Sequence, residues 1–244
     1  MFSESVDLLV NRTHPLDASY VPSDLIPVNI PFAYIGNDDR NYLRTPAAQA
    51  LEKMFADAKN SNLSLIGVSG YRSYDRQKMI YEQNLAVKGE EHTNLYSAKP
   101  GQSEHQTGLA IELSTPSIFS ALTTDFENTP EGIWLNDNSH RYGFILRYPS
   151  GKEHITGYAY EPWHFRYVGV PNATAMMTEG LCMEEYMDFI KRYTAGGLHY
   201  QVTTAEGIFD IYYAEGVQVP VPQMQSYEIS GNNVDGFIVT VKVG

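Results

Sequence analysis

Three short segments of the chain hold most of the side chains that can do chemistry. They are residues 69–73 with Gln77 one helical turn further on, residues 103–112, and residues 161–166. These segments contain two candidate imidazole ligands, His105 and His164, and one candidate carboxylate ligand, Glu112. Two histidines and one carboxylate leave the fourth position of a tetrahedral zinc ion to water, which is the pattern of a catalytic rather than a structural site.

The spacing of these residues permits a shared site but does not require one. His105 and Glu112 are seven residues apart, and on one flat strand an odd spacing would place them on opposite faces. The intervening residues 106–108 can supply a turn that lets a loop residue and a strand residue converge. Glu161 lies three residues before His164, where it could take a proton from metal-bound water without ligating the metal.

Each of these residues also has a plainer interpretation. A single histidine is more often a surface or satisfied core residue than a ligand, and Glu161 alone is most simply a solvated acid. Trp163 and Phe165 fit a hydrophobic core better than a substrate contact. Spacing by itself therefore leaves both the zinc site and the structural interpretation open.

The pattern around these segments predicts alternating helices and strands. Thr45-Pro46 is expected to open a helix, because proline is tolerated at the first helical position, and Ser73 is expected to cap a second helix over 74–87. Alternation over 108–113 places Leu109, Ile111 and Leu113 on one strand face and Glu112 on the other. Further expectations are strands at 63–68, 142–147 and 163–168, a loop over 88–102, a helix capped by Asn172 and interrupted by Gly180, and a helix over 183–193.

The sequence pattern changes near Gly196, where alternating strand-like runs begin. Residues 1–196 are expected to form one domain with a loop-rich lead-in over 1–44, and residues 197–244 a small all-β appendage. The appendage carries no catalytic motif. Its tyrosines fit plain packing, and a contact with the cell wall or with the other domain is the functional alternative.

Charge and cysteine content exclude several classes of function. With 17 basic and 29 acidic side chains the net charge is −12, which disfavours a nucleic-acid partner. The single cysteine, Cys182, excludes an internal disulfide framework and a zinc site with several thiolates. No apolar run is long enough to cross a bilayer, and the acidic residues 1–10 are not expected to be a signal peptide.

The three segments resemble the signature of the zinc D-alanyl-D-alanine carboxypeptidases of the VanY type. Its motifs are Tyr-Arg-Ser followed by Gln, then Ser-x-His-x6-Asp, then Glu-x-x-His within Glu-Pro-Trp-His. The matching residues here are Tyr71, Arg72, Ser73, Gln77, Ser103, His105, Glu161, Trp163 and His164, with a further family-like run over 147–158. The resemblance covers about residues 43–169. It implies an α+β, hedgehog/lysostaphin-like peptidase core with an antiparallel sheet and flanking helices.

The resemblance also implies a role for each matching residue. His105, Glu112 and His164 would hold Zn²⁺, and Glu161 would act first as general base and then as general acid. Arg72 would stabilise the oxyanion or bind the substrate carboxylate, which suits a permanently charged, paired donor. The remaining substrate-binding candidates are Gln77, Ser103 and Trp163.

The implied reaction is hydrolysis of the bond before a C-terminal D-alanine of a peptidoglycan stem peptide. Within this resemblance the bond can be D,D or L,D, because no motif distinguishes the two, and the oligomeric state stays open. Peptidoglycan lies outside the cytoplasmic membrane, so a location outside the cell or in the envelope of a bacterium is expected, with any signal or anchor lying outside this sequence.

One departure from the family signature bears on activity. The family's ligand Asp corresponds here to Glu112, whose carboxylate reaches one methylene further. Because metal ligation depends on closely held distances, the alternative to a retained zinc site is a catalytically silent, cell-wall-binding homologue. A third interpretation is an endopeptidase of the same fold that cuts cross-bridges.

Overall fold

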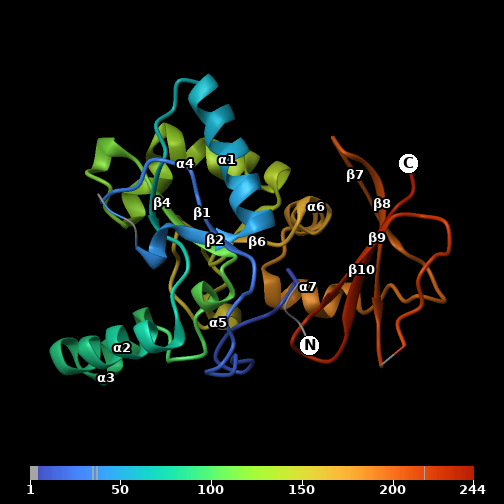
Figure 1. The fold of residues 1–244 in the computed structure, drawn as a ribbon, viewed down its shortest axis with the longest axis horizontal. Helices are drawn as coiled ribbons and strands as arrows, with labels where there is room; N and C mark the ends of the chain where they lie inside the picture. The colour runs from blue at the N-terminus through green and yellow to red at the C-terminus, as the bar shows by residue number, and fades with distance from the viewer. Residues whose placement is uncertain (1–4, 35, 37, 217) are drawn as a thin grey trace.

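The computed structural model describes residues 5–34, 36, 38–216 and 218–244, so the first four residues of the expected lead-in lie outside it. Its strands form a two-stranded ribbon and two separate four-stranded sheets (Figure 1). The ribbon pairs β1 (Leu25–Pro27) with β2 (Tyr42–Arg44), antiparallel, within the segment that the sequence predicts to be loop-rich.

The sheet that carries the candidate residues has the order β3-β4-β6-β5, with every neighbouring pair antiparallel. Its strands are β3 (Ile66–Ser69), β4 (Ala110–Ser114), β6 (His164–Tyr167) and β5 (Phe144–Leu146). The sequence predicts strands at all four places, although the observed ones are shorter. The expected α+β class with an antiparallel sheet and flanking helices is confirmed.

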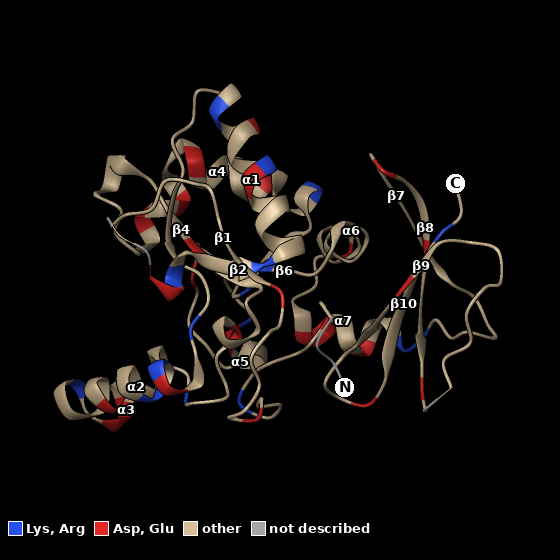
Figure 2. Ribbon diagram, viewed as in Figure 1, with Lys and Arg blue, Asp and Glu red and all other residues tan. Residues whose placement is uncertain are grey.

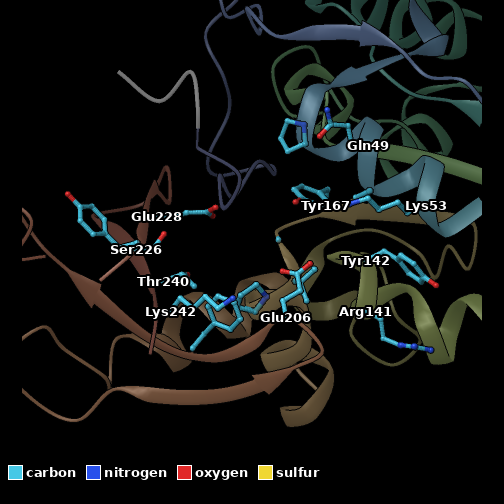
Figure 3. A pocket seen from close by; sticks show the side chains of 17 residues that line it. Gln49, Lys53, Arg141, Tyr142, Tyr167, Glu206, Ser226, Glu228, Thr240 and Lys242 are labelled. Carbon is cyan, nitrogen blue, oxygen red and sulfur yellow. The ribbon is translucent and has the colours of Figure 1, made fainter. Parts of the chain in front are cut away.

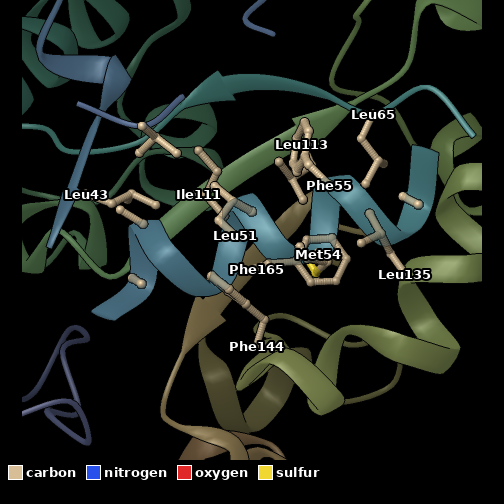
Figure 4. Packing of buried hydrophobic residues seen from close by; sticks show 14 of the residues in the cluster. Leu43, Leu51, Met54, Phe55, Leu65, Ile111, Leu113, Leu135, Phe144 and Phe165 are labelled. Atoms are coloured by element: carbon tan, nitrogen blue, oxygen red, sulfur yellow. The ribbon is translucent and has the colours of Figure 1, made fainter. Parts of the chain in front are cut away.

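Helix α1 (Thr45–Asn60) packs its apolar face on one side of this sheet (Figure 4). The buried side chains in this core include Leu51, Met54 and Phe55 of α1 and Ile111, Leu113 and Phe165 of the sheet. The side chains of β4 therefore alternate between the two faces as predicted: the odd-numbered residues enter the core, and Glu112 faces the opposite side.

Two helices, α2 (Tyr74–Lys88) and α3 (Glu90–Tyr96), form an arm that extends from the sheet β3-β4-β6-β5 (Figure 1). The Ser73 hydroxyl accepts a hydrogen bond from the Arg76 amide, so Ser73 caps α2 as predicted. The prediction of a loop over 88–102 is wrong for α3. Gly89, at φ 79°, ends one helix and starts the next, and the acidic residues Glu90 and Glu91 favour the first turn of α3 through the helix dipole.

The described chain contains four further α-helices. They are α4 (Pro130–Asn138), α5 (Glu153–Thr156), α6 (Val170–Glu179) and α7 (Met183–Ile190), with 3-10 turns at Asp39–Asn41, Glu104–Thr107, Pro116–Ile118, Thr124–Asn128 and Ser139–Tyr142. The prediction that Asn172 caps α6 is wrong. Asn172 lies inside the helix and is buried, and its side chain bonds the Tyr186 hydroxyl instead.

The C-terminal strands form an antiparallel sheet in the order β7-β8-β10-β9. They are β7 (Tyr200–Thr204), β8 (Gly207–Ala214), β10 (Phe237–Lys242) and β9 (Tyr227–Gly231). Side chains of α6 and α7, such as Met176 and Met187, share one core with Ile211 and Ile238 of this sheet. The second core therefore joins residues from both sides of the expected boundary at 196/197.

The N-terminal segment 5–11 runs between the two sheets. The Leu9 amide donates to the Asn232 carbonyl, and the Gly231 amide donates to the Ser5 hydroxyl. On the other side, the Arg166 guanidinium donates to the Val6 and Leu8 carbonyls, both at 2.8 Å. This segment thus ties the sheet β3-β4-β6-β5 to the C-terminal sheet.

The charged residues are spread over the molecule. On α1 and α2, Lys and Arg are interspersed with Asp and Glu (Figure 2), an arrangement unlike the basic stripe of a nucleic-acid-binding helix. Within the described ranges, no helix combines the length and apolar character that a membrane span requires.

Candidate metal centre and substrate pocket

A tight turn places His105 next to Glu112. His105 lies in the 3-10 helix Glu104–Thr107, and Gly108 then turns the chain into β4 with φ 67°, in the left-handed region. His105 is 2% exposed, and its Nδ1 lies 2.7 Å from the Gly70 carbonyl oxygen. A carbonyl can only accept, so Nδ1 carries the proton and Nε2 keeps its lone pair. That Nε2 lies 3.6 Å from Glu112 Oε1.

We expect Gly108→Ala to destabilise the fold more than Gly180→Ala does. Both glycines have left-handed φ angles, of 67° and 65°, which cost an alanine about 1–2 kcal/mol. A Cβ at Gly108 would also approach Leu25 Cδ2 to 2.7 Å and Arg44 Cγ to 3.0 Å, whereas one at Gly180 meets nothing within 4 Å. Overpacking adds ~1–3 kcal/mol. Urea unfolding of both variants checks this, and equal losses would contradict it.

His164 enters the same site from the neighbouring strand. Glu112 of β4 and His164 of β6 are directly paired in the antiparallel register. The ring centroids of His105 and His164 lie 5.0 Å apart. One ligand atom from each of His105, Glu112 and His164 lies within 4.8 Å of the others. The turn and the strand pairing thus bring together the three residues that the sequence suggests as metal ligands.

The protonation states of these residues suit a cation. Burial alone would raise the pKa of Glu112, but the neighbouring His105 and Arg72 lower it to about 2. Burial, and secondly the Arg72 charge, lower the pKa of His105. Near neutral pH the pair therefore consists of a carboxylate and a neutral imidazole, the forms that bind metal ions. His105 Nε2 is buried and has no hydrogen-bond partner among the described residues, which fits a role as a metal ligand.

Glu161 and Arg72 flank the three candidate ligands. Glu161 Oε2 lies 3.1 Å from His164 Nδ1. The Arg72 guanidinium donates to Gln77 Oε1 at 2.8 Å and to the Ser69 hydroxyl at 3.3 Å, and its Nη2 lies 3.9 Å from Glu112 Oε1. A carboxylate and a fixed guanidinium therefore face the same space as the candidate ligands.

These residues line a pocket of about 210 Å³. Gln77 lies in its wall, 1% exposed, and also donates to the Ala98 carbonyl at 2.6 Å, so both ends of its amide are engaged. Ser103 lines the pocket too. Trp163 packs against the main core and is not among the lining residues, so its role in substrate binding stays a prediction.

Sequence reasoning missed several residues of the pocket wall. They are Ile80, Asn84, Tyr96, Ser97, Ala98, Glu104, Tyr148 and Tyr158. Tyr148 and Tyr158 belong to the family-like run over 147–158, which is a signal for their region. Residues 96–98 could not be assigned to the pocket from the sequence, because the sequence predicts α2 but a loop in place of α3.

Another cleft, of about 390 Å³, lies between α1 and the C-terminal sheet, away from the candidate ligands (Figure 3). Its walls include Lys53, Tyr142 and Tyr167 on one side and Glu206 and Lys242 on the other. It contains none of the candidate ligands. Chemistry rather than volume therefore identifies the candidate site.

The comparisons with known proteins agree with this geometry. Residues 40–170 match the VanY family, described as D-alanyl-D-alanine carboxypeptidase. The putative carboxypeptidase YodJ of Bacillus subtilis (strain 168) is 44% identical over 189 residues, covering 78% of this chain and 69% of that protein. A D-alanyl-D-alanine carboxypeptidase of Enterococcus faecium is 36% identical over 245 residues, covering 97% of this chain and 75% of that protein.

Solved structures match as well. The LdcB LD-carboxypeptidase aligns with TM-score 0.72 and 46% identity, over 74% of this chain and 84% of that one. The D,D-dipeptidase VanXYg, in complex with a D-Ala-D-Ala phosphinate analog, gives TM-score 0.82 and 36% identity, over 97% and 93%. A VanY D,D-pentapeptidase mutant in complex with Zn(II) gives 0.59 and 34%, over 75% and 98%. The resemblance seen in the three motifs is confirmed, and the chain belongs to the VanY family of D-alanyl-D-alanine carboxypeptidases.

Proposed function

We propose that the chain is a zinc-dependent carboxypeptidase that removes a C-terminal D-alanine from peptidoglycan stem peptides. The observation that supports this most is the convergence of ligand atoms from His105, Glu112 and His164 within 4.8 Å, beside Glu161 and Arg72. These three residues would hold the Zn²⁺, as the complex of a VanY neighbour with Zn(II) suggests. The ion would lower the pKa of its water and polarise the scissile carbonyl.

The protein's own groups carry the proton transfers. Glu161 is proposed to accept a proton on a carboxylate oxygen when water attacks the scissile carbonyl carbon. It then returns that proton to the amine of the departing D-alanine, so that one residue serves both half-steps. Its position beside His164 Nδ1 places this carboxylate next to the candidate ligands.

Arg72 is proposed to bind negative charge, either the developing oxyanion or the substrate's terminal carboxylate. Gln77 supports this role because it bonds both Arg72 and the Ala98 carbonyl and so fixes the guanidinium. The substitution Arg72→Lys would keep the charge but lose the fork of donors. Ser103, at the pocket wall, is proposed to orient the substrate's terminal groups.

Glu112 is proposed to be a working ligand despite the extra methylene. In its present position it already lies opposite His164 in the strand register and near His105 Nε2. The silent, wall-binding homologue is the competing proposal. Stem-peptide binding without turnover, persisting in Glu112→Asp, would support that alternative.

One experiment tests metal dependence, turnover and bond type together. We expect the full chain, incubated with zinc and synthetic stem peptides, to release free D-alanine, and a chelator to abolish the release. Both a tetrapeptide and a pentapeptide are needed, because the structural neighbours include an LD-carboxypeptidase and a D,D-dipeptidase. Mass analysis identifies the products. Absence of D-alanine from both peptides in excess zinc refutes the proposal, and cleavage of cross-linked dimers without free D-alanine points to an endopeptidase.

We further propose that the protein acts in the bacterial cell envelope, where peptidoglycan lies, and that residues 197–244 are an appendage to the peptidase domain. The match to VanXYg covers 97% of this chain and so extends into this segment. Its shared core with α6 and α7 supports a role in packing.

A further inference from the structure

Glu104 is a buried carboxylate to which the mechanism above gives no role. It is 1% exposed and lies immediately before His105. Its Oε1 accepts hydrogen bonds from Arg147 Nε and Arg166 Nη1, both at 2.8 Å. Its other oxygen, Oε2, is buried and has no hydrogen-bond partner among the described residues. A buried acceptor left without a partner is costly, so such an atom calls for an explanation.

The atom that faces this oxygen is also without a partner. His164 Nε2 is buried, has no hydrogen bond within the described ranges, and lies 3.9 Å from Glu104 Oε2. The other ring nitrogen, Nδ1, faces Glu161. The imidazole of His164 therefore lies between two carboxylates. Closing the gap to Glu104 by about 1 Å would make a normal hydrogen bond and satisfy both atoms at once.

The position of Glu104 is fixed from several directions. Arg147 is itself held by both carboxylate oxygens of Glu184 on α7, at 2.9 and 2.7 Å. Arg166 is held by backbone carbonyls of the N-terminal segment. Two guanidinium groups donate to Glu104 Oε1 at 2.8 Å and hold this carboxylate in place, so its other oxygen, Oε2, is left as a hydrogen-bond acceptor.

A neutral imidazole has one N–H and one lone pair. An anion beside Nε2 favours the form in which Nε2 carries the proton, and this leaves the Nδ1 lone pair for a metal. In His105 the two ring nitrogens have the opposite roles: Nδ1 donates to the Gly70 carbonyl, and Nε2 is left for the metal. Metal-binding histidines generally donate their second N–H to a carboxylate or carbonyl, which fixes the ring.

We propose that Glu104 is a positioning residue that accepts a hydrogen bond from His164 Nε2–H and so presents His164 Nδ1 to the metal. This inference rests on the metal site of the proposed function. It does not depend on which peptide is cleaved.

The first test uses the wild-type full chain labelled with ¹⁵N-histidine and loaded with zinc. Long-range ¹H–¹⁵N spectra distinguish a protonated ring nitrogen from a metal-bound one, and His164→Gln identifies the His164 signals by their loss. We expect His164 Nε2 to be protonated and Nδ1 to be metal-bound, with the opposite assignment at His105. A metal-bound His164 Nε2 overturns the proposal. A protein that shows the expected tautomer but releases no D-alanine would contradict only the proposed function.

The second test compares Glu104→Gln with Glu184→Gln. In Glu104→Gln the two arginines require the carbonyl oxygen of the new amide, so its NH₂ group would face His164 and force the lone pair onto Nε2. We expect zinc affinity, measured by chelator competition, to fall by about 10–100-fold, and the metal-free His164 to change tautomer. Glu184→Gln removes a charge from the same arginine cluster without approaching His164, so it should leave affinity within about twofold. Equal losses of zinc affinity in the two variants would show that the effect comes from the arginine cluster and not from a contact between Glu104 and His164. If Glu104→Gln does not fold, the NMR experiment on the wild-type chain still tests the proposal.

Discussion

Glu161→Gln is expected to lower kcat by ~10²–10⁴-fold, the range in which a positioned acid–base group contributes. Glutamine keeps the size and shape of the side chain beside His164, whose Nδ1 lies 3.1 Å from the Glu161 carboxylate. It cannot accept the proton of the attacking water, however. The loss should therefore fall on turnover and not on substrate binding or zinc content.

Steady-state release of D-alanine, with zinc measured in the same samples, checks this expectation. Glu153→Gln is a matched control, because Glu153 is an exposed acid in the nearby helix α5 and lies outside the pocket wall. It should retain wild-type turnover. A Glu161→Gln variant that keeps its zinc and more than about a tenth of the wild-type kcat would remove Glu161 from the role of base.

Asp7→Asn is expected to stabilise the protein progressively as pH rises from about 4 to about 8. Asp7 is buried between α6 and β9, where it accepts from Asn172 Nδ2 at 3.1 Å. Burial raises its pKa from 3.8 to about 7, although the Ser230 hydrogen bond and Arg166 oppose the rise. The folded state thus holds a proton that the unfolded state releases above about pH 4. Stability is lost as pH rises through this window, by on the order of 4 kcal/mol once Asp7 is ionised.

Asparagine at position 7 keeps the acceptor and has no charge to bury. Urea unfolding of both proteins at several pH values across this window measures the difference. Asp17→Asn provides the control, because Asp17 is exposed and its pKa is lowered by hydrogen bonds from Ser19, so the advantage of that variant should not grow with pH. If the free energies of unfolding of wild type and Asp7→Asn differ by the same amount at every pH, the pKa of Asp7 is not raised in the folded protein.

The sheet β3-β4-β6-β5 and its candidate metal ligands are the most predictable part of the molecule. The alternation around Glu112 assigns its face, and the turn at Gly108 explains how His105 reaches it despite the odd spacing. These signals are local in sequence, which is why they can be recognised without a structure. The α3 helix escapes prediction because its seven residues carry no apolar periodicity.

The other parts that escape prediction depend on distant partners. Glu104 differs from an ordinary solvated acid only through Arg147 and Arg166, which lie far beyond it in the chain. Asn172 looks like a helix cap in sequence, and it is buried because Asp7 and Tyr186 meet it from other segments. The proline-rich lead-in gives no sign that its residues Leu8 and Val10 are fully buried.

The strap formed by residues 5–11 also constrains the order in which this protein can fold. Its partners Ser230, Gly231 and Asn232 lie more than 220 residues further along the chain, so these contacts cannot form until that later segment has been synthesised. Until then Arg166, which the strap covers, lacks its carbonyl partners, and Glu104 beside it is not yet fixed. The full set of contacts around Glu104, beside the candidate metal ligands, therefore depends on a closure across more than 220 residues, and such long-range closure slows folding.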